Sequence, residues 1–275
     1  MTSFISDPQY WWSENVQRFM RNQPITGNIY SILSLVIGSV LVIKLAAPRF
    51  AIFSRDIKLD YRPIFLVFNG FWFGVSGAGV PMIAVISSSG NWDWFQFVDR
   101  DSMELRDMAV KHLAYVFALT CLFDMGKSLL ATCSGKPDRL TSDITLVHRA
   151  AWSLVVLLSV SLYPVGPIGF VGAVYCFYRC FYYGYLVMTC TSAELKLQSL
   201  KQWKSNVELV HLIAFVSIFV HQLYFWSMSP NYQQRLASGL MASYAGFASL
   251  AIAYGLIPSV IPSVVVNTKT SKKMR

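Results

Sequence analysis

The sequence predicts an all-α integral membrane protein with seven transmembrane helices, and three observations support this. Of its 275 residues, 55% are hydrophobic and only 13% are charged, whereas soluble domains usually carry about a quarter charged residues. Several apolar stretches match the roughly 20 residues that a helix needs to cross a membrane. Lysine and arginine also gather in alternate loops between these stretches, a distribution typical of polytopic membrane proteins.

The first predicted span, 29–47, is expected to end at Pro48, because proline interrupts a helix interior. The second, 63–88, is expected to be broken by its glycine-rich run GVSGAGVP. The other spans are predicted at 107–125, 146–162, 166–190, 208–227 and 236–262. Because the spans take up most of the chain, residues 1–275 are expected to form one polytopic domain.

The basic residues predict the orientation of the chain. Fourteen lysines and arginines lie on one side of the predicted spans and five on the other, and the more basic side faces the cytosol or matrix. We therefore expect the C-terminus on that side, and the N-terminus, with Trp11 and Trp12 at interface depth, on the other. This topology explains the net charge of +9, so no nucleic-acid partner is expected. The final SKKMR matches either a dilysine retrieval signal or a basic membrane-surface tail.

Ionisable residues at membrane depth are costly and mark candidate sites. Most of them fall toward the cytosolic ends of spans three to six, where they could share one cavity. Because an unpaired buried charge is costly, Asp124 or Glu208 is the expected partner of Arg179. The full set comprises Lys111, His112, Asp124, Lys127, His148, Arg149, Arg179, Glu208, His211 and His221.

Several kinds of site could use these residues. A metal site needs histidines at ligand spacing, and the sequence has only isolated ones, so no metal is expected. A proton path lacks a repeated chain of acids and histidines. Acyl transfer needs a nucleophile, a base and an oxyanion stabiliser, which His148, Arg149, Tyr178 and Tyr182 could supply in part. Residue types alone favour a polar network that fixes helix packing. Cysteines such as Cys176 are expected to be small packing residues.

Two stretches, residues 48–77 and 178–185, resemble the ELO family of fatty-acid elongases. The run PRFAIFSRDIKLDYRPIFLVFNGFWFGVSG (48–77) is similar to the family's loop after the first span and the start of the second, including Phe68-Asn69. The stretch YRCFYYGY (178–185) resembles the motif H-x-x-M-Y-x-Y-Y and keeps Tyr182 and Tyr185. The resemblance covers nearly the whole chain through its span number, cytosolic C-terminus, basic tail and motif order.

The resemblance implies a ring of six helices around a long acyl tunnel, with a seventh helix outside the ring. ELO elongases condense an acyl-CoA with malonyl-CoA in the endoplasmic reticulum membrane, and a motif histidine is thought to carry the acyl group. A tunnel that opens near His148 and holds a lipid chain is therefore expected. Its expected polar lining is Asp124, Lys127, Arg179, Tyr185, Glu208 and His211.

The chain departs from the family at the catalytic motifs. H-x-x-H-H aligns with 145–149 and leaves only His148, while Tyr178 replaces the histidine that opens the second motif. The family motif K-x-x-E-x-x-D-T aligns with 124–131, and the motif T-Q-x-Q-x-x-Q aligns with 205–211. This sequence lacks most of the residues of both motifs. His148 is thus expected to lack a second imidazole, and the charge of Arg149 disfavours an imidazolium beside it. Losing one base or one oxyanion donor typically costs about 10²–10⁴ in rate.

These departures favour a non-catalytic elongase-like protein, a structural or lipid-binding subunit of a larger complex in the endoplasmic reticulum or mitochondrial inner membrane. Its expected partners are a membrane lipid or acyl chain and other membrane subunits. The alternative is a divergent elongase that uses His148, with acyl-CoA and malonyl-CoA as substrates and no cofactor. A transporter or channel is disfavoured, because the sequence lacks paired discontinuous helices in two similar halves.

Overall fold

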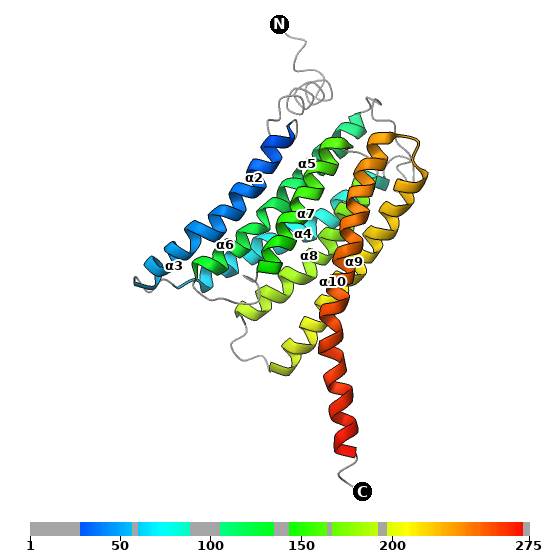
Figure 1. Cartoon of the computed structure of the whole chain (residues 1–275). Helices are drawn as coiled ribbons and strands as arrows, with labels where there is room; N and C mark the ends of the chain where they lie inside the picture. The colour runs from blue at the N-terminus through cyan, green and yellow to red at the C-terminus, as the bar shows by residue number, and fades with distance from the viewer. Residues whose placement is uncertain are drawn as a thin grey trace.

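The computed structural model describes residues 28–56, 60–88, 105–134, 143–163, 167–191 and 197–271, and all regular elements within them are helical. They pack as a long bundle, in which α2 begins at one end and α10 ends at the other (Figure 1). The elements are α2 (Ile29–Leu41), the π-helical turn η1 (Val42–Ala46), α3 (Ala47–Asp56), α4 (Arg62–Ser88), α5 (Leu105–Phe123), α6 (Met125–Cys133), α7 (Asp143–Leu162), α8 (Pro167–Thr191), α9 (Leu197–Met228) and α10 (Tyr232–Ser271).

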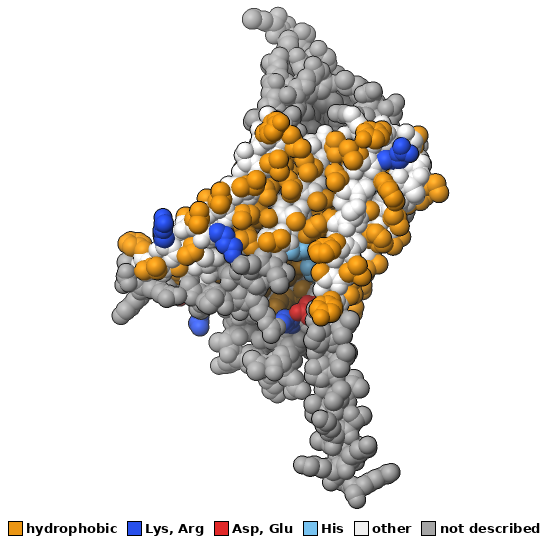
Figure 2. All heavy atoms as spheres, viewed as in Figure 1, with side chains coloured by type: hydrophobic (Ala, Val, Ile, Leu, Met, Phe, Trp, Pro, Cys, Tyr) orange, Lys and Arg blue, Asp and Glu red, His pale blue; other side chains and the backbone are white. Residues whose placement is uncertain are grey.

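Six helical segments of the described chain are long and apolar enough to cross a membrane. They are Ile29–Phe53, Arg62–Val80, His112–Cys133, Thr145–Leu162, Trp203–Met228 and Tyr232–Tyr254. Hydrophobic side chains also far outnumber charged ones on the described face in Figure 2. The prediction of an all-helical integral membrane protein is therefore confirmed.

The predicted span 166–190 corresponds to α8, a 25-residue helix that is not among these six segments. Five tyrosines and Arg179 lower the hydropathy of α8. Its surroundings are nevertheless those of a central helix, because α8 packs against both α4 and α9 and has Tyr183 and Arg179 almost fully buried. Six spans are thus established by length and composition, against the seven predicted.

The prediction that the first span ends at Pro48 is wrong, because the helix continues through α3 to Asp56. In the π turn before it, the backbone N–H of Ala47 donates to the carbonyl of Val42. A proline inside a helix lacks an N–H and crowds the carbonyl four residues earlier. The wider turn directly before Pro48 gives its ring room, which explains why the helix does not stop.

The glycine-rich run does not break the second span, since α4 is one helix from Arg62 to Ser88. A Cβ on Gly79 would lie 3.2 Å from Sγ of Cys176, and one on Gly77 would lie 3.8 Å from Sγ of Cys180. Small facing residues let two membrane helices approach closely. Cys176 and Cys180 are therefore the packing residues that the sequence predicted, and each is a free thiol.

The third predicted span, 107–125, is divided at Asp124 into α5 and α6, and the apolar segment extends to Cys133. Lys127, two residues beyond the predicted end, is only 1% exposed inside α6. The division thus brings Asp124 and Lys127 into the interior of the bundle. Trp11, Trp12, the final residues 272–275 and the side chain of Lys111 lie outside the described part of the chain.

Candidate functional site

Arg179 and Asp124 form the centre of a buried polar cluster between α8 and the junction of α5 and α6. Nη2 of Arg179 lies 2.9 Å from Oδ1 of Asp124, and the two side chains are only 2% and 7% exposed. Nη1 of Arg179 donates to Oγ1 of Thr120 at 2.9 Å. The prediction that Asp124 pairs with Arg179 is therefore confirmed.

Aromatic side chains surround this ion pair. The hydroxyl of Tyr183 donates to Oδ1 of Asp124, and that of Tyr175 donates to Oδ2 at 3.4 Å. The guanidinium carbon of Arg179 lies 4.8 Å from the ring centroid of Trp72 on α4, within the usual cation–π distance. Two of the five tyrosines of α8 thus donate hydrogen bonds to the carboxylate of Asp124. This accounts for phenols beside Arg179.

A second set of contacts joins α6, α7 and α8 at the hydroxyl of Tyr182. Nζ of Lys127 donates to this oxygen at 2.6 Å, and Nη2 of Arg149 donates to it at 2.9 Å. Nη1 of Arg149 donates to Oγ of Ser128 at 2.8 Å. Tyr182 therefore accepts hydrogen bonds from two cations. Within the described chain, the side-chain partners of Arg149 are hydroxyls rather than carboxylates.

His148 lies beside a second imidazole, contrary to the expectation from the sequence. The ring of His211 on α9 lies 5.7 Å from that of His148, centroid to centroid, and it stacks on Tyr178 at 4.1 Å. Nδ1 of His148 is 2.7 Å from the hydroxyl of Tyr244, which donates to the backbone carbonyl of His148 at 2.8 Å. Nε2 of His211 is buried without a hydrogen-bond partner in the described residues.

The other predicted site residues are placed differently. Glu208 does not reach Arg179, because its Oε1 lies 3.5 Å from Nζ of Lys204 on the half-exposed outer part of α9. Tyr185 is partly buried and packs against the small core formed by Trp72, Tyr183 and Leu186. His221 is buried elsewhere in the bundle, with its ring stacked 4.0 Å from that of Phe170.

Several partners in the cluster were not predicted as site residues, among them Tyr175, Tyr183 and Trp72 around the ion pair. Thr120 precedes Asp124 by one helical turn and Ser128 adjoins Lys127, so a search for hydroxyls near buried ionisable residues would have found both. Tyr244 carries no such signal, because it lies in a run of small and apolar residues far from any charged residue. Its role depends on how α10 packs against α7.

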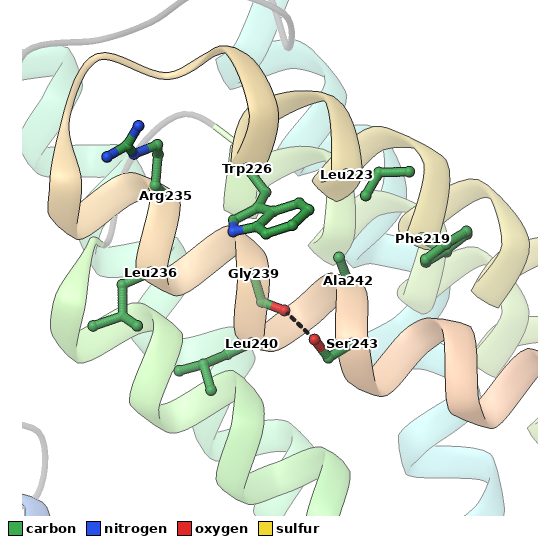
Figure 3. Close-up of a pocket in the computed structure, with 9 residues that line it drawn as sticks. All are labelled: Phe219, Leu223, Trp226, Arg235, Leu236, Gly239, Leu240, Ala242 and Ser243. Carbon is green, nitrogen blue, oxygen red and sulfur yellow. Dashed lines mark hydrogen bonds between the residues drawn. The ribbon is translucent and has the colours of Figure 1, made fainter.

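Two cavities lined by described residues lie away from this cluster. One of about 310 Å³ lies between α9 and α10 (Figure 3), and one of about 10 Å³ is lined in part by Ser159 and Gln222. Beside His148, the ring of Phe215 lies at 5.6 Å, centroid to centroid. The acyl tunnel stays a prediction. The described residues also contain no group of three or more potential ligands arranged for a metal ion.

The fold and the cluster define a helical integral membrane protein with a buried network of charged, phenolic and imidazole side chains. No family model matches the chain, and no curated protein matches it. The resemblance to the elongases therefore rests on the sequence motifs alone.

Proposed function

We propose that this chain is a non-catalytic membrane protein of elongase-like architecture, which serves as a structural or lipid-binding subunit of a larger membrane complex. One observation carries the proposal: the groups that a condensing reaction would use are engaged in contacts between helices. Arg149 and Tyr182 bind each other across α7 and α8, and Tyr178 stacks on His211 across α8 and α9. These contacts hold three helices together.

In this proposal α8 crosses the membrane as a seventh span, and six helices surround a tunnel that holds a lipid or acyl chain. Arg149 supports a role for an acidic lipid, because its described partners are hydroxyls and guanidinium binds carboxylate or phosphate more strongly than a neutral acceptor. The complex would lie in the endoplasmic reticulum or the mitochondrial inner membrane, with the C-terminus in the cytosol or matrix.

Large side chains on the outer faces of the bundle support contacts with other subunits as well as with lipid. Phe53 on α3, Phe71 on α4 and Phe247 on α10 are 58%, 61% and 71% exposed. The native mass of the protein extracted in mild detergent, with identification of comigrating proteins, tests the proposal. We expect an assembly of several different subunits, and migration as a monomer or homodimer would count against it.

A divergent elongase that uses His148 is the second candidate, and the nearby His211 specifically favours it. A neutral imidazole can act as a nucleophile or a base, and a second ring 5.7 Å away supplies the partner that the motif lacks. Histidine atoms are also visible in a hollow of the described face in Figure 2, which would give a substrate access.

Incorporation of labelled malonyl-CoA with acyl-CoAs of several lengths separates the two candidates. If the protein is an elongase, His148→Ala should abolish incorporation, whereas His221→Ala, a change of the same kind outside the cluster, should leave it intact. That pattern would overturn the non-catalytic proposal. Absence of incorporation with every acyl-CoA, together with a large native assembly, would overturn the elongase.

A further inference from the structure

Described residues of α9 and α10 line a groove on the outside of the bundle. We call it the outer groove. It has a volume of about 310 Å³, at the lower end of the range of roughly 300–1,000 Å³ seen for small-molecule sites. Its walls are mostly apolar and include Phe219, Leu223, Trp226, Leu236, Leu240 and Ala242. Several of these side chains are more than a third exposed, so the groove opens toward the surrounding membrane.

Small residues of α10 create the outer groove. A Cβ on Gly239 would lie 2.9 Å from Cδ1 of Trp226, so a glycine here lets the indole lie this close to α10. The small side chain of Ala242 leaves space in the groove beyond Gly239 (Figure 3). The hydroxyl of Ser243 donates to the carbonyl of Gly239 at 2.8 Å and is thereby satisfied within its own helix. The body of the groove is consequently suited to hydrocarbon.

Arg235 lies at one end of the outer groove, near the loop that joins α9 and α10 (Figure 3). It is exposed, and within the described chain its guanidinium has neither an ion-pair nor a hydrogen-bond partner. The apolar segment begins at Tyr232, only three residues earlier, which places Arg235 near the membrane–water interface. From there to Ser243 the groove follows α10 for eight residues, about 12 Å at 1.5 Å per residue.

We propose that the outer groove binds a membrane phospholipid, with the phosphate on Arg235 and part of one acyl chain along Trp226 and Ala242. A cation at the interface end and apolar walls toward the membrane centre match the two parts of such a lipid. Arginine binds phosphate through two parallel hydrogen bonds, and tryptophan is favoured where an apolar body meets a polar region. The site is separate from the buried cluster and does not depend on the proposed function.

Retention of defined lipids by the purified full-length protein, counted by native mass spectrometry, tests this site. The probes are phosphatidylglycerol and a diacylglycerol with the same acyl chains but no phosphate. Arg235→Gln should lower phosphatidylglycerol retention about tenfold, as expected for a lost charge-assisted hydrogen bond. Ala242→Phe should lower it by filling the groove.

Two matched changes serve as controls. Arg49→Gln removes an exposed arginine from α3, and Leu250→Phe enlarges a residue of α10 that is 73% exposed outside the groove. Both should retain phosphatidylglycerol like the unmodified protein. Arg235→Gln alters only an exposed side chain, so it decides the question even if Ala242→Phe does not fold.

Three results would overturn the proposal. The first is equal phosphatidylglycerol retention by Arg235→Gln and Arg49→Gln. The second is diacylglycerol retention as strong as that of phosphatidylglycerol, which would indicate a neutral lipid. The third is a dimer that Ala242→Phe dissociates, which would make a second copy of the chain the occupant of the outer groove.

Discussion

Arg179 of α8 and Asp124 at the junction of α5 and α6 form an almost fully buried ion pair, with 2.9 Å between Nη2 and Oδ1. Thr120, Tyr175 and Tyr183 each bond to one of the two charged groups. The pair therefore links α8 to the one place where the third span is interrupted, and it accounts for an arginine in the middle of a membrane protein.

Arg179→Met should destabilise the protein by about 3–5 kcal/mol, because it leaves the Asp124 carboxylate buried without its cation. The double variant Arg179→Met with Asp124→Leu should recover most of that loss, since a buried ion pair can often be replaced by apolar residues of similar volume. Thermal unfolding of the three proteins in one detergent checks this. A double variant less stable than Arg179→Met would contradict the prediction.

Tyr182→Phe should destabilise the protein by about 1–3 kcal/mol, because Lys127 and Arg149 both lose a buried acceptor. Tyr178→Phe is the matched control, one turn earlier on the same helix, since the Tyr178 hydroxyl makes no hydrogen bond within the described chain. Unfolding midpoints of the two variants should separate clearly. Equal midpoints would show that the shared hydroxyl does not hold α6, α7 and α8 together.

Gly79→Val should destabilise the contact between α4 and α8 by about 1–3 kcal/mol, because it adds bulk to a closely packed site. Gly74→Val introduces the same side chain on α4 where nothing lies within 4 Å of the new Cβ, and should have little effect. Cys176→Ala added to Gly79→Val should restore part of the stability by removing the sulfur. Equal unfolding midpoints for the two valine variants would be evidence against close packing here.

The proposal that α8 is a seventh span predicts that reporters at the two ends of the chain lie on opposite sides of the membrane, because seven is an odd number of crossings. Protease protection of N-terminal and C-terminal tags in sealed membrane vesicles measures this directly. Protection of both tags, or of neither, would mean that α8 does not cross.

The sequence predicted the helical membrane fold well, because long apolar stretches directly report burial in lipid. Helix ends were predicted less well. Pro48 and the glycines of α4 are signals of helix interruption, yet a π turn accommodates the first and close packing against Cys176 uses the second. Both outcomes depend on neighbours that are distant in sequence. The spacing of apolar residues does not encode them.

The candidate site was predicted in its residue types but only partly in its pairs. Asp124 was expected to bind Arg179 because a buried charge requires a partner, and this general rule was sufficient. Glu208 met the same rule, but its place on α9 lets it reach Lys204 instead. The approach of His148 and His211 could not be predicted, because it depends on how α7 and α9 lie around Phe215.

The contact between Tyr244 and His148 favours one tautomer of the imidazole, because only with that tautomer are both short contacts of the phenol hydrogen bonds. The phenol has a single proton, and donating it to the carbonyl of His148 requires the ring to supply the proton between Nδ1 and the phenol oxygen. Nε2 then carries only a lone pair. A molecule bound beside His148 would be recognised there through a group that donates a hydrogen bond, such as a hydroxyl or an amide, rather than through a carboxylate.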